Sequence, residues 1–174
     1  MKNLSSLYDI KLEKFHLYQD EEVMIARTGY TGELGVEIIS DANKGLEIWN
    51  YFISKGIQPI GLAARDTLRL EAGFNLYGSD MTVENNPYDS NLEWTVDQSE
   101  QDRDYIGKKA LKHLQETKNR LVGFYTDARG VLRSGTKVSF EGGEGVITSG
   151  TWSPTFKKNI GFCRITKNFP ETGV

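Results

Sequence analysis

The run R-T-G-Y-T-G-E-L-G-V-E-I, at residues 27–38, decides how the first part of the chain folds. The apolar residues 23–25 before it and the run V-E-I-I-S at 36–40 are typical of short β-strands. Glycines spaced three residues apart between them let the backbone turn sharply and leave room for a ligand to approach closely. The sequence therefore predicts two strands joined by a glycine-rich loop.

Glu37 is the residue of this run whose side chain could most clearly bind a ligand. In an extended strand its side chain faces away from Val36 and Ile38, so the carboxylate meets either water or a pocket. Water is the ordinary surrounding for a glutamate. A pocket would suit a heterocycle with adjacent N–H donors, because a carboxylate accepts two parallel hydrogen bonds. The run lacks the Gly-Lys-Ser/Thr signature of a phosphate-binding loop.

Two helices are expected after this loop. Apolar residues at helical spacing predict an amphipathic helix over 42–55, which Gly56 ends. A second helix is predicted over 63–72, with Gly73 in the left-handed position that closes a helix. Before residue 74, the predicted strands are thus followed by two helices.

Arg65 lies within the run G-L-A-A-R-D-T-L-R-L-E-A-G at 61–73. It shares a helix face with Arg69, four residues later. It could reach into a pocket at the helix N-terminus, where ligand sites are common. The alternative is a helix stabilised by structural ion pairs, for instance between Asp66 and Arg69, and the pattern alone favours this second interpretation.

The polar run at 97–104 is typical of a linker, and the texture of the sequence changes after residue 119. A third helix is expected over 106–114, with Asp104 as its cap. Short strand-like runs separated by glycine, serine and proline turns then predict a small antiparallel barrel or sandwich. These runs are residues 121–125, 136–140, 145–149 and 159–165.

Composition limits the classes of protein. The chain has 174 residues, of which 38% are hydrophobic and 11% aromatic, which indicates a globular protein. A net charge of −3 argues against a nucleic-acid partner. The single cysteine, Cys163, excludes an internal disulfide, and two isolated histidines leave little for a metal site. The sequence shows no membrane-spanning segment, so a cytoplasmic protein without metal or membrane partner is expected.

The motifs together resemble the glycine cleavage system T-protein, an aminomethyltransferase. The runs at 27–38 and 61–73 are followed by L-Y-G-S-D-M at 76–81, in the order expected for that family. The run Y-I-G-K-K-A-L at 105–111 resembles the opening of its C-terminal domain, and G-V-I-T-S-G at 145–150 resembles its barrel motif.

The resemblance implies an α+β fold class. Residues 1–104 would be the C-terminal part of the folate-binding aminomethyltransferase domain, with a mixed or antiparallel sheet and helices. Residues 105–174 would form a small antiparallel β-barrel of the T-protein type. Such a piece exposes strand edges and an apolar face, so a homodimer through these edges is expected unless a partner covers them.

The family's activity is the transfer of a one-carbon unit from the aminomethyl-lipoyl arm of H-protein to tetrahydrofolate, with release of ammonia. The resemblance implies that Glu37 binds the pterin ring and that Arg65 lines the same folate site. Phe74 stands where some relatives carry an aromatic residue near the folate. The residues expected to shape the loop rather than to react are Tyr30, Gly32 and Glu33.

One departure from the family bears on activity. The family's catalytic aspartate belongs to the N-terminal half, which has no counterpart here, so no residue receives a catalytic role. The chain therefore resembles a C-terminal piece of a T-protein that is inactive alone. Two alternatives stay open: a folate-dependent demethylase relative, and a non-catalytic folate-binding or assembly module.

Overall fold

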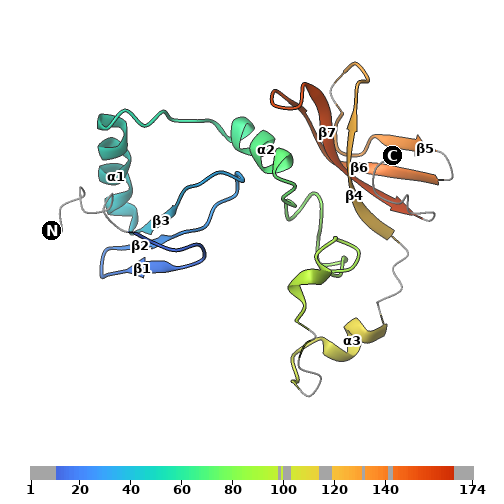
Figure 1. Cartoon of the computed structure of the whole chain (residues 1–174), viewed down its shortest axis with the longest axis horizontal. Coiled ribbons are helices and arrows are strands. Elements are labelled where there is room, and N and C mark those ends of the chain that lie inside the picture. The colour runs from blue at the N-terminus through green and yellow to red at the C-terminus, as the bar shows by residue number, and fades with distance from the viewer. Residues whose placement is uncertain are drawn as a thin grey trace. The chain divides into compact units, whose positions relative to one another are not determined.

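The computed structural model describes residues 11–97, 99, 103–113, 119–130, 132–140 and 143–166 (Figure 1). The chain divides into two compact units, Met1–Leu68 (unit 1) and Arg69–Val174 (unit 2). The boundary between the units falls inside a helix. The domain boundary after residue 104, drawn from the family resemblance, stays a prediction.

Unit 1 contains a three-stranded antiparallel sheet in the order β1-β2-β3. The strands are β1 (Leu17–Gln19), β2 (Val23–Ala26) and β3 (Glu37–Ser40). Strands β2 and β3 form the predicted pair around the glycine-rich run, and Ala26 stands opposite Glu37. The prediction of two strands joined by this loop is confirmed.

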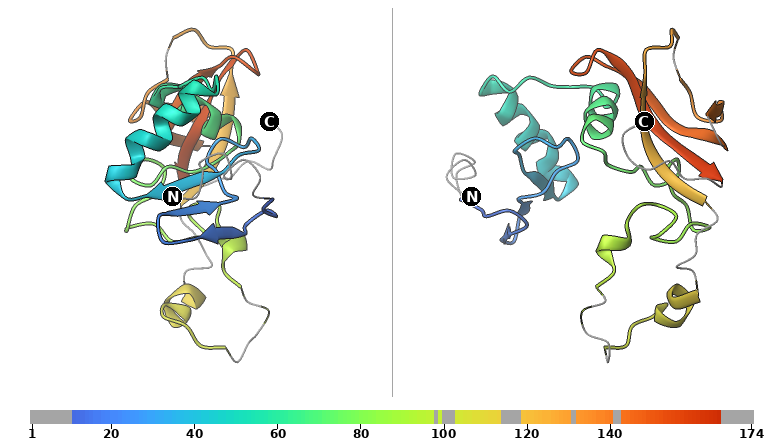
Figure 2. Two further views of the ribbon diagram at one scale, coloured as in Figure 1. Left: turned by 90° about the vertical axis from the view of Figure 1, so that its left-hand side faces the viewer. Right: turned by 45° about the vertical axis from the view of Figure 1, so that its right-hand side comes forward.

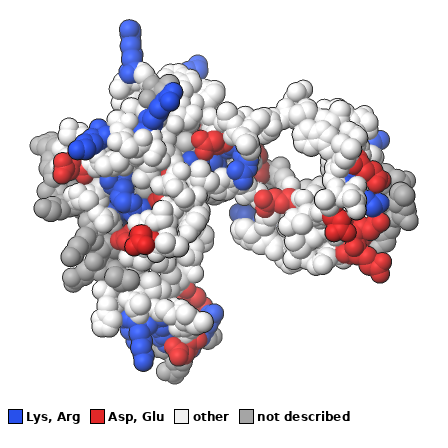
Figure 3. All heavy atoms as spheres, turned by 180° about the vertical axis from the view of Figure 1, so that it is seen from behind, with Lys and Arg blue, Asp and Glu red and all other residues white. Residues whose placement is uncertain are grey.

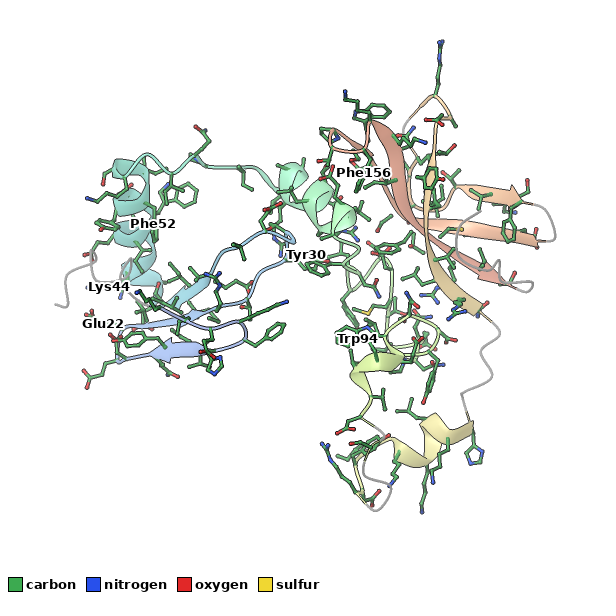
Figure 4. The ribbon with its side chains drawn as sticks, viewed as in Figure 1. Glu22, Tyr30, Lys44, Phe52, Trp94 and Phe156 are labelled. Carbon is green, nitrogen blue, oxygen red and sulfur yellow. The ribbon has the colours of Figure 1, made fainter. Side chains whose placement is uncertain are left out.

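Helix α1 (Ala42–Ser54) follows β3 directly. Its predicted extent is confirmed to within one residue, and Gly56 beyond its end has a φ of +80°. Ile48 is its buried side chain. Lys44 in the first turn lies 3.4 Å from Glu22, beside the start of β2, so an ion pair links the helix to the sheet (Figure 4). Hydrogen bonds from this lysine to Glu22 and Glu47 raise the pKa of Lys44.

Helix α2 (Leu62–Glu71) contains the boundary between the units. Its end has the geometry that Gly73 predicts: the N–H of Gly73 donates to the carbonyl of Leu70 at 3.1 Å, and Phe74 N–H donates to that of Arg69 at 2.8 Å. This pair of bonds is the Schellman motif, which requires a left-handed residue, and Gly73 has a φ of +77°.

Helix α3 (Lys108–His113) starts later than predicted. The prediction placed Ile106 inside the helix and Asp104 at its cap. Gly107 instead has a φ of +95°, which no right-handed helix contains, so the helix can begin only after it. Ile106 consequently lies outside the helix, fully exposed. Leu114, at the end of the predicted helix, lies outside the described residues.

The remaining elements of unit 2 form a four-stranded antiparallel sheet in the order β4-β7-β6-β5, preceded by a short 3-10 helix, η2 (Glu93–Thr95) (Figure 2). The four predicted strand-like runs are all confirmed. The strands are β4 (Asn119–Thr126), β5 (Lys137–Phe140), β6 (Gly143–Ser153) and β7 (Lys158–Thr166).

A buried apolar cluster joins the end of α2 to this sheet. Leu70 contacts Leu121 on β4, and Ile160 and Phe162 on β7 complete the cluster. Cys163 is 3% exposed, as its apolar strand predicts, and burial raises the pKa of its thiol. Among the described residues, every helix is too short or too polar to cross a membrane.

A buried ion pair lies beside this cluster. Arg69 Nη1 is 2.6 Å from Asp80 Oδ2, and the two side chains are 1% and 0% exposed. Arg69 Nη2 also donates to Ser149 Oγ at 2.8 Å, and Thr148 Oγ1 donates to Asp80 Oδ1 at 2.6 Å. Leu76 N–H donates to Asp80 Oδ2 at 2.8 Å. Both buried charges are therefore paired and hydrogen-bonded, as charges in a protein interior must be.

Arg164 on β7 holds the segment that contains Asp80, residues 76–89. Its Nη2 donates to the carbonyl of Asp80 at 2.6 Å and its Nη1 to that of Asp89 at 2.9 Å. Desolvation by burial lowers the pKa of Arg164, against the attraction of Asp89 and Asp80, which raises it. Segment 76–89 is thus attached to the sheet by the Arg164 side chain and by one backbone hydrogen bond, from Leu121 N–H on β4 to the carbonyl of Asp89 at 2.9 Å.

We expect removal of one partner of the buried pair to destabilise unit 2 strongly. Asp80→Ala leaves the Arg69 guanidinium buried without its counter-ion, which costs about 3–5 kcal/mol in the free energy of unfolding. Urea unfolding followed by the fluorescence of the chain measures this change.

The exposed pair of Arg103 with Asp97, at 3.4 Å, supplies a matched control. Asp97→Ala should change the free energy of unfolding by less than about 1 kcal/mol. Equal small losses for Asp80→Ala and Asp97→Ala would contradict the structural role of the buried pair.

Candidate functional site

The glycine-rich loop connects β2 to β3 and is held by short local contacts. Gly32 has a φ of +77°, a conformation that favours glycine, so it is the glycine that the turn requires. Glu33 N–H donates to Thr31 Oγ1 at 3.3 Å, which closes the turn beside it. The loop-shaping role of Tyr30, Gly32 and Glu33 stays a prediction.

The carboxylate of Glu37 lies at the base of the loop, where β3 begins. It is exposed, and Thr28 Oγ1 donates to Glu37 Oε2 at 2.5 Å. The alternation along β3 places Glu37 and Ile39 on the more exposed side and Ile38 on the more buried side. Of the two surroundings weighed from the sequence, water or a pocket, the structure shows the exposed one for this chain.

Thr28 is a partner of Glu37 that sequence reasoning missed. The strand register contained the signal, because Ala26 pairs with Glu37 and Thr28 is two residues further along the same side of the hairpin. The threonine fixes one carboxylate oxygen and so limits the rotation of the Glu37 side chain. A pre-oriented carboxylate loses less conformational entropy when it binds a ligand.

Arg65 and Tyr30 meet within unit 1. The guanidinium carbon of Arg65 lies 4.5 Å from the centroid of the Tyr30 ring, within the range of a cation–π interaction. Tyr30 comes from the glycine-rich loop, and Arg65 comes from the first turns of α2 (Figure 4). The loop and the helix are therefore connected, and the two sequence motifs that contain these residues form one surface of unit 1.

Phe74 belongs to unit 2. It is 38% exposed, and its carbonyl accepts a hydrogen bond from Arg69 Nη1 at 3.0 Å. Glu37 and Arg65 lie in unit 1, so the predicted folate-binding residues are divided between the two units. Within each unit, the structure joins Glu37 to Thr28, Arg65 to Tyr30, and Phe74 to Arg69.

Arg69 is the second residue whose role the sequence did not reveal. Its position between Leu68 and Leu70 placed a charge among apolar neighbours, which is a signal of a buried and paired group. The local pattern offered Asp66 as a partner for Arg69. The structure adds Asp80 and Ser149, which lie 11 and 80 residues away in the chain.

The charge of the described part of unit 1 is mainly negative. In the described residues of unit 1, acidic side chains outnumber basic ones, and Figure 3 shows them gathered on the part of the molecule at the right. A ligand that offers N–H donors would gain from Glu37, whereas an anionic group would need Arg65. His16 and His113 are both exposed, and the described residues contain no cluster of three metal-ligating side chains.

Comparison with family models assigns both parts of the chain. Residues 7–100 match the model described as the GCVT N-terminal domain. Residues 119–174 match the model described as the glycine cleavage T-protein C-terminal barrel domain. The first match alone covers more than half of the chain.

Individual relatives agree with the family models. An aminomethyltransferase of Stenotrophomonas maltophilia (strain K279a) is 49% identical over 146 residues, which are 83% of this chain and 39% of that protein. An aminomethyltransferase of Francisella tularensis subsp. tularensis (strain WY96-3418) is 48% identical over 147 residues, covering 83% and 41%. The chain therefore spans about two fifths of the length of these curated relatives.

A solved structure supports the fold. The crystal structure of glycine cleavage system aminomethyltransferase T from Bartonella henselae superposes with a TM-score of 0.84 at 31% sequence identity. The superposition covers 94% of this chain and 48% of that chain. The architecture expected from the motifs, a partial T-protein fold, is confirmed.

Proposed function

Since this chain belongs to the glycine cleavage T-protein family, we propose that it contributes the folate-binding part of a tetrahydrofolate-dependent aminomethyltransferase. The full reaction would move a one-carbon unit from the aminomethyl-lipoyl arm of H-protein to tetrahydrofolate and release ammonia. The observation that carries the proposal is the contact between the two motifs, in which Arg65 of α2 stacks on Tyr30 of the glycine-rich loop.

Glu37 is the proposed acceptor for the pterin ring. Its carboxylate is exposed and held by Thr28, so it is available to donors from outside the chain. Adjacent N–H and amino groups of a pterin match the two oxygens of a carboxylate. Arg65 supplies the cation of the same unit, and its ring contact with Tyr30 limits the directions in which its guanidinium can point.

Binding without catalysis is the second candidate function. No aspartate of this chain matches the family's catalytic residue, and orientation of the substrates by that residue is what a transferase requires. A folate-binding or assembly module needs only the loop and the helix. A folate-dependent demethylase relative would share the same binding residues. It would differ from an aminomethyltransferase in the donor of the one-carbon unit.

Calorimetric titration of the chain with tetrahydrofolate, under reducing conditions, tests the site. We expect Glu37→Ala to weaken binding by about 2–4 kcal/mol in the complete protein, where buried pterin donors would lose a charged acceptor, and by less in this chain, where Glu37 is exposed. Glu21→Ala removes an exposed carboxylate from the turn before β2 and should leave the dissociation constant unchanged. The same dissociation constant for Glu37→Ala and the unmodified chain would remove Glu37 from the site.

A turnover assay separates an enzyme from a module. The chain is mixed with aminomethyl-lipoyl H-protein and tetrahydrofolate, and ammonia and 5,10-methylenetetrahydrofolate are measured. We expect no product above the reaction without protein, because no catalytic aspartate is assigned to this chain. Product formation that depends on the chain would show that it is an enzyme alone and would exclude the module.

Self-association is the last part of the proposal. Several large apolar side chains of unit 1 are more than half exposed: Leu34, Ile39, Leu46, Trp49, Ile60 and Leu62. Exposed apolar area of this kind favours association in water. A second copy of the chain could cover this surface.

We expect the mass from light scattering to rise from that of one chain towards that of two as concentration increases. Trp49→Glu places a charge within the exposed apolar surface of unit 1 and should shift the equilibrium towards the monomer. Val83→Glu makes the same kind of change in unit 2, at a side chain that is 82% exposed, and serves as the control. A mass of one chain at every concentration would contradict the dimer.

A further inference from the structure

A cavity in unit 2 lies outside all of the residues assigned to folate. It is open to solvent, its volume is about 540 Å³, and it is lined by the last turn of α2, the middle of β4, the first half of β7 and Phe156 before β7. This volume is within the range of small-molecule sites. Glu37, Arg65 and Phe74 do not line it.

Aromatic side chains form much of the wall. Tyr125 on β4 and Phe162 on β7 lie on the same face of the sheet, because they stand opposite Ile160 and Gly123 in the strand pair. Phe156 stands in the turn between β6 and β7 (Figure 4). Tyr125 is 64% and Phe156 54% exposed, so their rings are open to a ligand rather than buried in the core. Aromatic faces prefer to pack against other planar rings, in offset or edge-to-face arrangements.

Gly123 leaves free space in the cavity because it has no side chain. A Cβ added there would meet nothing closer than Phe162 Cε1 at 4.0 Å, an ordinary contact. The other strand glycine that lines the cavity, Gly161, differs, because its Cβ would collide with the carbonyl oxygen of Ser149. Packing of the sheet therefore explains Gly161 but leaves Gly123 unexplained. A glycine within a strand weakens it and often marks a close approach by a ligand.

The charged groups at the wall are one cation and one anion, and they differ in availability. Glu71 is occupied: Ser153 Oγ donates to its Oε1, and Thr155 donates through N–H to Oε1 at 3.3 Å and through Oγ1 to Oε2 at 2.9 Å. Burial acts to raise the pKa of Glu71, but these hydrogen bonds together outweigh it and lower the pKa below its ordinary value. Glu71 is therefore an ionised structural group with its acceptors already in use.

Lys158 is the available charge. Its Nζ lies 4.6 Å from the centroid of the Tyr125 ring and 3.5 Å from Asp127 Oδ2. Asp127 is 79% exposed and does not line the cavity, so this ion pair is a weak surface interaction. An anionic group in the cavity can take the place of Asp127, and the lysine then binds it while remaining over the aromatic face.

We propose that this cavity binds a planar aromatic carboxylate, with its ring against the aromatic wall beside Gly123 and its carboxylate at Lys158. The aromatic wall selects a flat ring, Gly123 provides its space, and Lys158 provides the counter-charge. The proposal concerns unit 2 alone and holds whether or not the chain binds tetrahydrofolate.

Two isosteric probes test the proposal on the whole chain: 2-naphthoate, which is anionic, and 2-naphthamide, which is neutral. Amide NMR spectra follow each titration. We expect saturable shifts at the amides of Gly73, Gly123 and Gly161, with 2-naphthoate bound more tightly than 2-naphthamide. Absence of saturable shifts at these amides, or equal affinities for the two probes, would overturn the proposal.

Two substitutions identify the groups responsible. Gly123→Val fills the space beside Gly123 with a residue that favours strands. It should weaken the binding of 2-naphthoate by about tenfold or more. Lys158→Met keeps the apolar stem and removes the charge. It should weaken the binding of 2-naphthoate by about threefold and leave the binding of 2-naphthamide unaffected. Lys137→Met on β5, away from the cavity, is the matched control and should change neither affinity.

The amide spectrum and the urea midpoint show whether each variant retains its fold. Should Gly123→Val disturb the sheet, Gly123→Ala adds a single methyl group at the same place and should weaken 2-naphthoate by a smaller factor. Unchanged binding of 2-naphthoate in a folded Gly123→Val variant, or an equal loss in Lys137→Met and Lys158→Met, would overturn the assignment of the ligand to this cavity.

Discussion

Unit 2 depends on the ion pair between Arg69 and Asp80. Two charges without solvent exposure are costly unless each has a full set of partners, and here the partners come from two separate segments, β6 and the turn after α2. Ser149 and Thr148 come from β6, while the backbone groups of Phe74 and Leu76 come from the turn after α2. The pair can therefore form only when helix, turn and sheet are all in place, which makes their folding cooperative.

The described residues of unit 1 contain no buried ion pair comparable to that of Arg69 and Asp80. Its fully buried apolar side chains are Ile25 and Ile48, whereas many others of similar size are exposed. A three-stranded sheet with α1 and the first part of α2 has too few layers to cover both of its faces. Because the chain spans about two fifths of the length of its curated relatives, the exposed apolar surface of unit 1 is the part of the fold that most needs a covering partner.

The sequence predicted what local rules determine. The strands, the extent of α1 and the Schellman turn at Gly73 follow from periodicity and from the conformational freedom of glycine. The start of α3 was wrong because Ile106 fitted the helical spacing while Gly107 broke the helix. The partners of Arg69 could not be predicted, because Ser149 is 80 residues away and only the fold brings it near. The exposure of Glu37 stayed open for the same reason: strand alternation names a side, and tertiary structure decides what covers it.

The family membership and the exposed carboxylate together limit what unit 1 can achieve. Thr28 and Tyr30 orient Glu37 and Arg65 before any ligand arrives, which lowers the entropic cost of binding. Orientation alone gives little affinity in water, because each hydrogen bond to a ligand replaces one to solvent. The same bonds become stronger once water is excluded and the effective dielectric falls. Any affinity for the proposed ligand, tetrahydrofolate, would therefore report whether something covers Glu37 and excludes water from its carboxylate.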